Sequence, residues 1–294
     1  MPTLKGLYQQ AQAGANLVVT GPHYEWLERL EHEQVPSARA MAFLIRAHLR
    51  QFKHDRTRRI SPSSMGECPR RIMFDYAGAP ALAFDDNSQE MMDHGTISHL
   101  KWQVEGLTMG YMAEAEHWVE NTELMVGGSM DAVLADNSLF ELKSAGPWVY
   151  NKVVLDAKAP KWENLLQVGT YFVLYDTDWA SIVYEDRGTG QFHEFRVQRD
   201  ARVEREVLRR LESYRRYAAN DELPPQLADC ELRMGTVFRR CPYRGMCHIP
   251  DSITTAATMP ESPVYGKRTP LAEALPDWAQ ALLRSAEELE DSAR

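Results

Sequence analysis

The side chains best placed to do chemistry are two carboxylates and a lysine, Asp131, Glu141 and Lys143. Asp131 follows a Gly-Gly break, and its spacing from Glu141 allows a hairpin to bring the two carboxylates together. Glu141 and Lys143 are two apart on an expected strand and therefore face the same side. Carboxylates suit Mg²⁺ or Mn²⁺, and a neighbouring lysine can orient a metal-bound water or stabilise charge on a phosphate. An exposed Glu–Lys strand face is the alternative interpretation of this pattern.

Three further side chains stand in order around this group. His99 is expected near the start of a helix, and a neutral imidazole there could bind the same cation. Gln167 and Tyr171 are four apart on another expected helix, so they share one face and could position the lysine or a phosphate. Each of these residue types is more often structural than functional. The order His, Asp, Glu-x-Lys, Gln-x-x-x-Tyr is therefore what carries weight.

The second candidate group is the four cysteines, Cys68, Cys230, Cys241 and Cys247. In a reducing compartment, four cysteines favour a metal site over two disulfides. No two of them form the C-x₂₋₄-C pair of a zinc ribbon or finger. Four thiolates can instead hold a 4Fe–4S cluster that joins the N-terminal and C-terminal parts of the chain. Four unrelated buried thiols are the alternative.

The charge is unevenly distributed along the chain. The net charge of -9 comes from 33 Lys+Arg against 42 Asp+Glu, which alone argues against nucleic-acid binding. Residues 46–71, however, hold eight Lys/Arg against two carboxylates, whereas residues 85–141 hold twelve Asp/Glu and one lysine. Such segregation suits a cation site beside an anionic substrate, and two solvated faces are the alternative. No apolar run reaches the roughly 20 residues of a membrane span, and the N-terminus lacks a secretory signal, so a cytoplasmic protein is expected.

The elements that must position these residues follow from periodicity and turn signals. The sequence predicts helices over 38–53, 88–109, 161–175, 200–218 and 271–290. It predicts strands across 115–144 and at 179–186 and 191–198, with the last two forming a hairpin. The Pro-, Ser- and Thr-rich stretch 250–270 is expected to be an irregular linker.

In motif order the sequence resembles the RecB-family branch of the PD-(D/E)-x-K nucleases, specifically its iron–sulfur exonucleases. That group includes the CRISPR-associated Cas exonucleases, the AddB nuclease domain and related phage exonucleases. The similarity runs from about Ser61 to Cys247, with Cys68 matching the first cluster ligand and the last three cysteines following the nuclease motifs. The nuclease motifs match at Gly95 and His99, Gly128 and Asp131, Glu141 and Lys143, and Gln167 and Tyr171. Met130 stands where the superfamily's name has proline, and the ten-residue gap between Cys230 and Cys241 indicates an inserted loop.

The resemblance implies an α/β fold with a restriction-endonuclease-like PD-(D/E)XK core, in which helices flank a central mixed sheet. N-terminal and C-terminal arms would be joined by the 4Fe–4S cluster. The expected organisation is an N-terminal helical arm over 1–60, the nuclease core with its cluster over 61–250, and a linker with a C-terminal helix over 251–294.

The resemblance further implies a metal-dependent DNA exonuclease. Mg²⁺ or Mn²⁺ would be held by His99, Asp131, Glu141 and the carbonyl of Leu142. Lys143 would act on the attacking water, Gln167 and Tyr171 would orient Lys143 and the phosphate, and the cluster would be structural. DNA with a single-stranded or free end would be contacted by basic residues, namely Arg58, Arg59, Arg70 and Arg71. Trp102, Trp148 and Tyr150 are candidates for stacking on bases.

Two alternatives remain open at this stage. One is an endonuclease or flap nuclease on the same site. The other is a non-catalytic DNA-binding accessory protein of recombination. A role in DNA recombination or repair with a recombination or helicase partner is consistent with each, and the sequence leaves the oligomeric state open.

Overall fold

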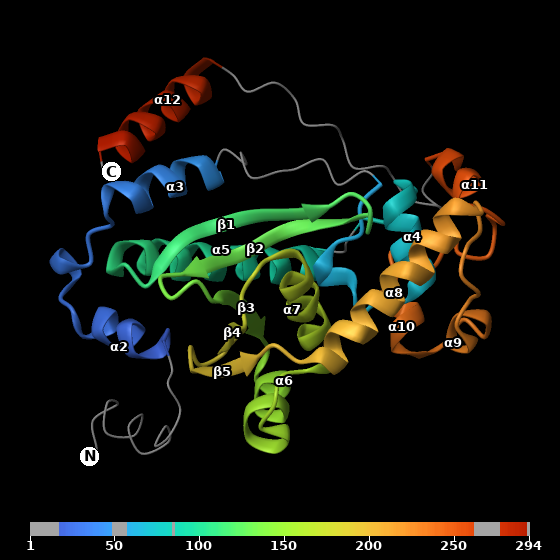
Figure 1. Cartoon of the computed structure of the whole chain (residues 1–294), viewed down its shortest axis with the longest axis horizontal. Helices are drawn as coiled ribbons and strands as arrows, with labels where there is room; N and C mark the ends of the chain where they lie inside the picture. The colour runs from blue at the N-terminus through green and yellow to red at the C-terminus, as the bar shows by residue number, and fades with distance from the viewer. Residues whose placement is uncertain (1–17, 49–57, 84–85, 262–276, 293–294) are drawn as a thin grey trace.

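A five-stranded mixed sheet forms the centre of the computed structural model, which describes residues 18–48, 58–83, 86–261 and 277–292 (Figure 1). The strands lie side by side in chain order, and only β3 and β4 are parallel neighbours. Their bounds are β1 (Met112–Asn121), β2 (Val126–Leu134), β3 (Leu139–Ala145), β4 (Trp179–Asp186) and β5 (Phe192–Gln198). The predicted α/β class with a central mixed sheet flanked by helices is confirmed.

Helices surround this sheet and extend the chain at both ends (Figure 1). The longest are α5 (Asp86–Met109), α8 (Ala201–Ala219), α12 (Asp277–Ser292) and α7 (Trp162–Leu174). The others are α2 (Thr20–Glu28), α3 (Ala38–His48), α4 (Pro69–Ala77), α6 (Pro147–Asn151), α9 (Ala228–Glu231), α10 (Gly235–Arg240) and α11 (Ile253–Thr258). Short 3₁₀ turns η1 (Glu31–Glu33) and η2 (Pro62–Ser64) and a π-helical stretch η3 (Lys152–Ala157) complete the set.

The two faces of the sheet have separate cores. On one face, Trp102 of α5 packs with Phe140 and Leu142 of β3. On the other face, Val168 and Phe172 of α7 pack against strand residues, and residues 166–172 of α7 are all buried. A helix that is buried all round needs cover on both sides, and α8 supplies the outer cover of α7. Because β3 and β4 are parallel, a crossover must join them, and α7 lies within that crossover.

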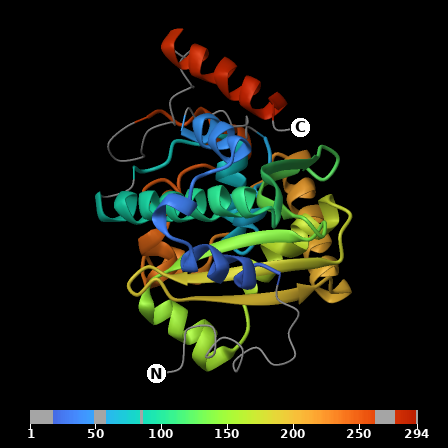
Figure 2. The same ribbon diagram turned by 90° about the vertical axis from the view of Figure 1, so that its left-hand side faces the viewer.

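Segments far apart in sequence lie side by side away from the sheet. The C-terminal helix α12 packs on α3, where Arg46 Nη1 lies 3.0 Å from Glu290 Oε1 (Figures 1 and 2). Helix α4 likewise contacts α11. No helix in the described ranges is long and apolar enough to cross a membrane.

Most predicted elements are confirmed, and the exceptions have local causes. The helices near 88–109, 161–175, 200–218 and 271–290 and the strands near 179–186 and 191–198 are present. Of the segments predicted over 38–53, 250–270 and 271–290, residues 49–53 and 262–276 lie outside the described residues. The prediction of an irregular 250–270 is wrong where α11 forms, because the Ser252 side chain caps the helix by accepting a hydrogen bond from the Thr255 amide. Helices α4, α6, α9 and α10 were not predicted. The three domain boundaries stay predictions.

Candidate active site and thiol cavity

The β2–β3 hairpin brings the first carboxylate beside the second strand. Ala132 pairs with Phe140 and Val133 with Leu139. One residue before Ala132 on β2, the Asp131 side chain turns toward β3, where its Oδ2 accepts a hydrogen bond of 2.7 Å from the Leu142 amide. The hairpin thus places Asp131 next to the Glu-x-Lys strand, as the spacing in the sequence predicted.

His99 reaches the same carboxylate from α5. Its Nδ1 lies 3.2 Å from Asp131 Oδ1. Burial would lower the pKa of His99, but the charge and hydrogen bond of Asp131 outweigh burial and raise that pKa to about 9. In turn, His99 overcomes the effect of burial on Asp131 and lowers the pKa of that carboxyl. The pair therefore exists as an imidazolium and a carboxylate at neutral pH.

Glu141, Lys143 and Gln167 form a closed triangle of polar contacts. Lys143 Nζ lies 2.7 Å from Glu141 Oε1 and donates to Gln167 Oε1 at 2.7 Å. Gln167 Nε2 then donates to Glu141 Oε1 at 2.8 Å. Burial and the charge of Asp131 raise the pKa of Glu141 to about 7 against the opposing effect of Lys143. The other oxygen, Glu141 Oε2, is buried and has no hydrogen-bond partner among the described residues.

Tyr171 holds the backbone that carries Asp131. Its hydroxyl donates to the Ser129 carbonyl at 2.6 Å. The neighbouring Gly128 is required by close packing, because a Cβ at this position would lie 2.6 Å from Pro62 Cδ. Tyr171 therefore fixes β2 against α7, and its predicted contact with a phosphate stays a prediction.

Sequence analysis missed Glu116, which lies across from Asp131 in the register of β1 and β2. Its two oxygens accept hydrogen bonds from Gln103 Nε2 at 2.9 Å and from Ser129 Oγ at 2.8 Å. Burial and the charge of Asp131 raise the pKa of this carboxyl. Glu116 also has a φ of 54°, the left-handed region that a glutamate seldom adopts. Only the strand register, which the sequence does not contain, would have singled it out.

The donor set of this site fits a hard divalent cation. Asp131 and Glu141 supply carboxylates and His99 an imidazole, and Glu141 Oε2, which has no hydrogen-bond partner among the described residues, can donate a lone pair to a cation. Among the described residues, however, no group of three or more His, Cys, Asp and Glu is arranged to hold a metal ion. In this arrangement Asp131 and Glu141 are turned toward His99 and Lys143 respectively.

The predicted DNA contacts have different surroundings. Arg70 is buried and donates to three backbone carbonyls, those of Cys247, Pro224 and Pro250. Its guanidinium faces the protein interior, so the prediction that Arg70 contacts DNA is wrong. Arg71 and Arg59 are partly exposed and pair with acidic residues, Glu67 at 2.9 Å and Glu120 at 3.1 Å respectively. Arg58 is exposed.

Of the three aromatic candidates for base stacking, two belong to the core. Trp102 is fully buried and Tyr150 is 5% exposed, so both are wrong as stacking candidates. Trp148 is 70% exposed and remains one.

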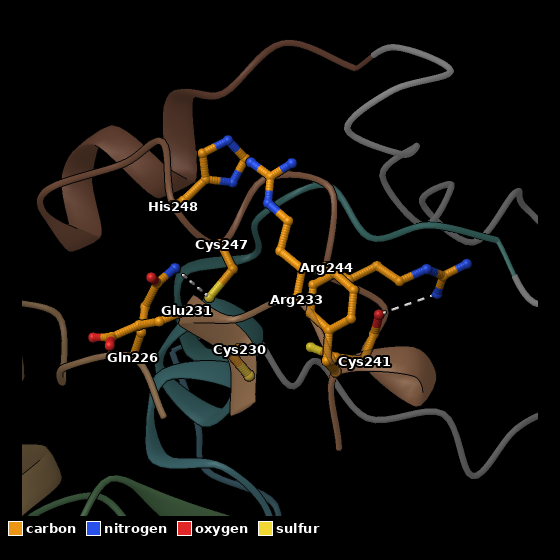
Figure 3. Close-up of a pocket in the computed structure, with 9 residues that line it drawn as sticks. Gln226, Cys230, Glu231, Arg233, Cys241, Arg244, Cys247 and His248 are labelled. Carbon is orange, nitrogen blue, oxygen red and sulfur yellow. Dashed lines mark hydrogen bonds between the residues drawn. The ribbon is translucent and has the colours of Figure 1, made fainter. Parts of the chain in front are cut away.

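The four cysteines are free thiols gathered in one region. Cys230, Cys241 and Cys247 line a cavity of about 100 Å³ (Figure 3). Burial raises the pKa of Cys230, and the thiols of Cys68 and Cys247 raise it further. Burial is also the main cause that raises the pKa of Cys241 to about 11, and the thiols of Cys247 and Cys68 add to it. Cys68 therefore lies within electrostatic range of this cavity, although a chain of 161 intervening residues separates it from Cys230.

Side chains of helix α4, which follows Cys68, bind it to the C-terminal cysteine segment. Arg70 donates to the carbonyl of Cys247 at 3.0 Å, and Tyr243 Oη donates to Asp75 Oδ1 at 2.6 Å. The Phe74 and Tyr243 rings pack 5.1 Å apart. Packing and hydrogen bonds therefore join these two parts of the chain, and the predicted joining by a 4Fe–4S cluster stays a prediction.

Comparisons with known proteins give weak similarities. No protein-family model matches the chain, and no curated protein matches it. Among solved structures, the alkaline exonuclease LHK-Exo from Laribacter hongkongensis has 18% identity and a TM-score of 0.40, over 58% of this chain and 98% of that chain. LHK-Exo in complex with dAMP has 18% identity and a TM-score of 0.41, over 56% and 95%. A structure of SSO0001 has 16% identity and a TM-score of 0.44, over 76% of this chain and 98% of that chain. Similarities this low establish neither a family nor an activity for this chain.

Proposed function

We propose that this chain is a divalent-metal-dependent deoxyribonuclease with a restriction-endonuclease-like core, and that it acts as an exonuclease. The observation that carries the proposal is the buried carboxylate–lysine pair of β3, in which Glu141 Oε2 has no hydrogen-bond partner in the part of the chain that the structure describes. A buried charge is costly unless it is paired, so a buried, unpartnered carboxylate oxygen is suited to act as a ligand of a cation. The order of the nuclease motifs along the chain supports the same assignment.

In this mechanism His99, Asp131, Glu141 and the Leu142 carbonyl would hold Mg²⁺ or Mn²⁺. A bound cation would supply a water of lowered pKa and offset the charge of the scissile phosphate. His99 could serve as a ligand only as a neutral imidazole, so it would give up its proton and its ion pair with Asp131.

Lys143 supplies a second positive charge on the same side of β3. Gln167 holds its ammonium group at 2.7 Å, which limits the positions that Nζ can take. A fixed ammonium beside the phosphate stabilises the charge that develops on its oxygens in the transition state. Gln167 is a positioning residue in this scheme, because it acts through Lys143 and Glu141.

The thiols of Cys68, Cys230, Cys241 and Cys247 are proposed to hold a 4Fe–4S cluster. The support is that Cys230, Cys241 and Cys247 line one cavity and that Cys68, from the other end of the core, lies close enough to affect the Cys230 thiol electrostatically. Thiolates are the usual protein ligands of such clusters. The cluster is structural in this proposal, since hydrolysis of a phosphodiester transfers no electron. Purified protein should be brown and carry about four iron atoms per chain; colourless protein with stoichiometric zinc would reject the cluster.

The test of the proposed activity is a nuclease assay on end-labelled linear and covalently closed circular DNA, with Mn²⁺ and with chelator. We expect degradation of linear DNA only, no activity with chelator, and loss of activity in Lys143→Ala. The matched control is Lys101→Ala, because Lys101 pairs with Glu185 at 3.2 Å outside the site. Equal activity of folded Lys143→Ala and Lys101→Ala proteins would overturn the site assignment.

Cleavage of circular DNA would instead favour the endonuclease alternative. DNA binding without any metal-dependent cleavage would favour a non-catalytic accessory protein.

A further inference from the structure

A helical projection leaves the candidate active site and returns to it. It consists of α6 and η3, which begin at Pro147, shortly after Lys143 of β3. The chain comes back as α7, whose Gln167 contacts Lys143. In Figures 1 and 2 this yellow-green helical segment projects from the body of the molecule. Both of its ends are therefore fixed to the two elements that carry the site.

The projection has one buried and one exposed side. Tyr150 and Val153 are buried and belong to the core that includes Val168 of α7 and Tyr184 of β4. On the other side, Trp148 is 70% exposed and Leu155 is 61% exposed. The π-helical stretch η3 begins at Lys152, which contacts the Trp148 ring, and it carries Leu155 as a second exposed apolar side chain of the projection. Most of the Trp148 ring is therefore open to a binding partner on an anchored helix.

The exposed side is also basic. Lys152 Nζ lies 4.7 Å from the centre of the Trp148 ring. Lys158 is exposed as well, and Asp156 is the one carboxylate within residues 147–161, which hold Lys152, Lys158 and Lys161. This sign is opposite to the chain's net charge of -9 and matches a phosphate backbone.

We propose that this Trp148 surface, made of Trp148, Lys152, Leu155 and Lys158, binds single-stranded DNA next to the active site. A base stacks on the Trp148 ring, and the lysines neutralise the adjacent phosphates. An aromatic ring beside cations is the combination that binds single strands without sequence preference, since every base presents a flat face. Base pairs of an intact duplex already stack on each other, so a free strand is the preferred ligand. This inference rests on the proposed nuclease function, whose substrate it specifies.

The test measures binding without cleavage. A fluorescently labelled oligothymidylate is titrated with the full chain in Ca²⁺, and the variants are Trp148→Ala and Trp278→Ala. Trp278 of α12 is the matched control, because it is 63% exposed and lies on a helix that packs on α3. We expect roughly tenfold weaker binding for Trp148→Ala, the order of effect that loss of one stacked base produces, and unchanged binding for Trp278→Ala. Thermal unfolding of each variant checks that it is folded.

A second variant tests the charge. Lys152→Ala with Lys158→Ala should reduce the steepness with which rising salt weakens the binding, since fewer counterions are released from the strand. Equal affinities of the Trp148→Ala and Trp278→Ala proteins would overturn the proposal and leave a protein partner as the occupant of this surface. Binding that depends on Trp148 in a protein without nuclease activity would refute the proposed function and keep the binding surface.

Discussion

Glu141 and Lys143 show how a single strand can hold two opposite charges away from water. Alternation along β3 points both side chains to the α7 face, where Gln167 contacts each of them. Each ion lowers the cost of burying the other, and the amide completes the hydrogen bonds of one carboxylate oxygen. The other oxygen, Glu141 Oε2, is free of such bonds among the described residues, and this makes Glu141 a candidate cation ligand as well as the partner of Lys143.

The titration of these groups predicts how cation binding depends on pH. His99, with a pKa of about 9, is protonated at neutral pH and must lose that proton to bind a cation. Glu141, with a pKa of about 7, adds a second proton below neutrality. Proton and cation compete, so Mn²⁺ affinity should rise with pH from 7 to 9 and fall more steeply below 7.

Calorimetric titration with Mn²⁺ in two buffers of different ionisation enthalpy measures the protons released. Release should be about one proton per cation at pH 8. The His99→Ala variant is the control and should release less. A pH-independent affinity in the wild-type protein would contradict this prediction.

Substitution of Arg70 is expected to lower the stability of the protein rather than its affinity for DNA. Its guanidinium satisfies the carbonyls of Cys247, Pro224 and Pro250, so Arg70→Ala leaves buried acceptors unpaired. Each unpaired group costs about 1–3 kcal/mol when buried, so we expect the variant to lose at least that much free energy of unfolding. Urea unfolding followed by circular dichroism is the measurement.

Arg71→Ala is the matched neighbour on the same helix. Arg71 is partly exposed and pairs with Glu67, so its loss should change the free energy of unfolding by about 1 kcal/mol or less. Equal stabilities of the two variants would show that the three carbonyl contacts of Arg70 matter little.

At the scale of elements, the spacing of residues predicted part of the site. The β2–β3 hairpin and α7 follow from alternation, Gly-Gly and Pro160, and these elements carry Asp131, Glu141 and Gln167. The role of Glu116 could not be predicted from the sequence, because its position next to Asp131 depends on how β1 pairs with β2, which is a non-local feature. The environment of Arg70 was missed for the same reason, since its partners lie more than 150 residues away in sequence. From sequence alone, a run of Lys and Arg such as the one that contains Arg70 is expected to lie on the solvated surface, and only the tertiary contacts show which of its side chains are buried.

A pair of glycine substitutions tests the packing of β2 on η2. Gly128→Ala places a Cβ 2.6 Å from Pro62 Cδ, so the strand or η2 must move. We expect a loss of roughly 1–3 kcal/mol in the free energy of unfolding, the usual range for overpacking. The shift should also weaken Mn²⁺ binding, because Gly128 precedes Ser129, whose carbonyl Tyr171 holds.

Gly95→Ala is the contrasting variant. A Cβ at Gly95 in α5 meets nothing within 4 Å, and alanine is favoured over glycine in a helix by about 1 kcal/mol. Thermal unfolding of both variants should therefore move in opposite directions. A stabilised Gly128→Ala protein would contradict the close approach of η2.

At the scale of the whole molecule, the region around α4, which begins after Cys68, packs on the segment after α8 that lines the thiol cavity. Cys68→Ser should abolish the brown colour and reduce the iron content if a cluster is bound there. We expect the thermal midpoint to fall by several degrees without loss of the fold, because Arg70, Tyr243 and Asp75 continue to hold the segment. Iron analysis and calorimetry on the same preparation measure the iron content and the thermal midpoint. An unfolded Cys68→Ser protein would show that the contacts of Arg70, Tyr243 and Asp75 are insufficient to hold the segment.

The agreement between chain order and strand order has a consequence for biosynthesis. Each strand of the sheet can be added to the one before it as the chain emerges, so Asp131 and Leu142 can meet once a single hairpin is made. The contact of Lys143 with Gln167 must wait for α7. The thiol cavity must wait longest, because Cys68 is made early and its partners Cys230, Cys241 and Cys247 come after the last strand. If the proposed cluster forms, iron delivery would therefore be a late maturation step, acting on a nearly finished core.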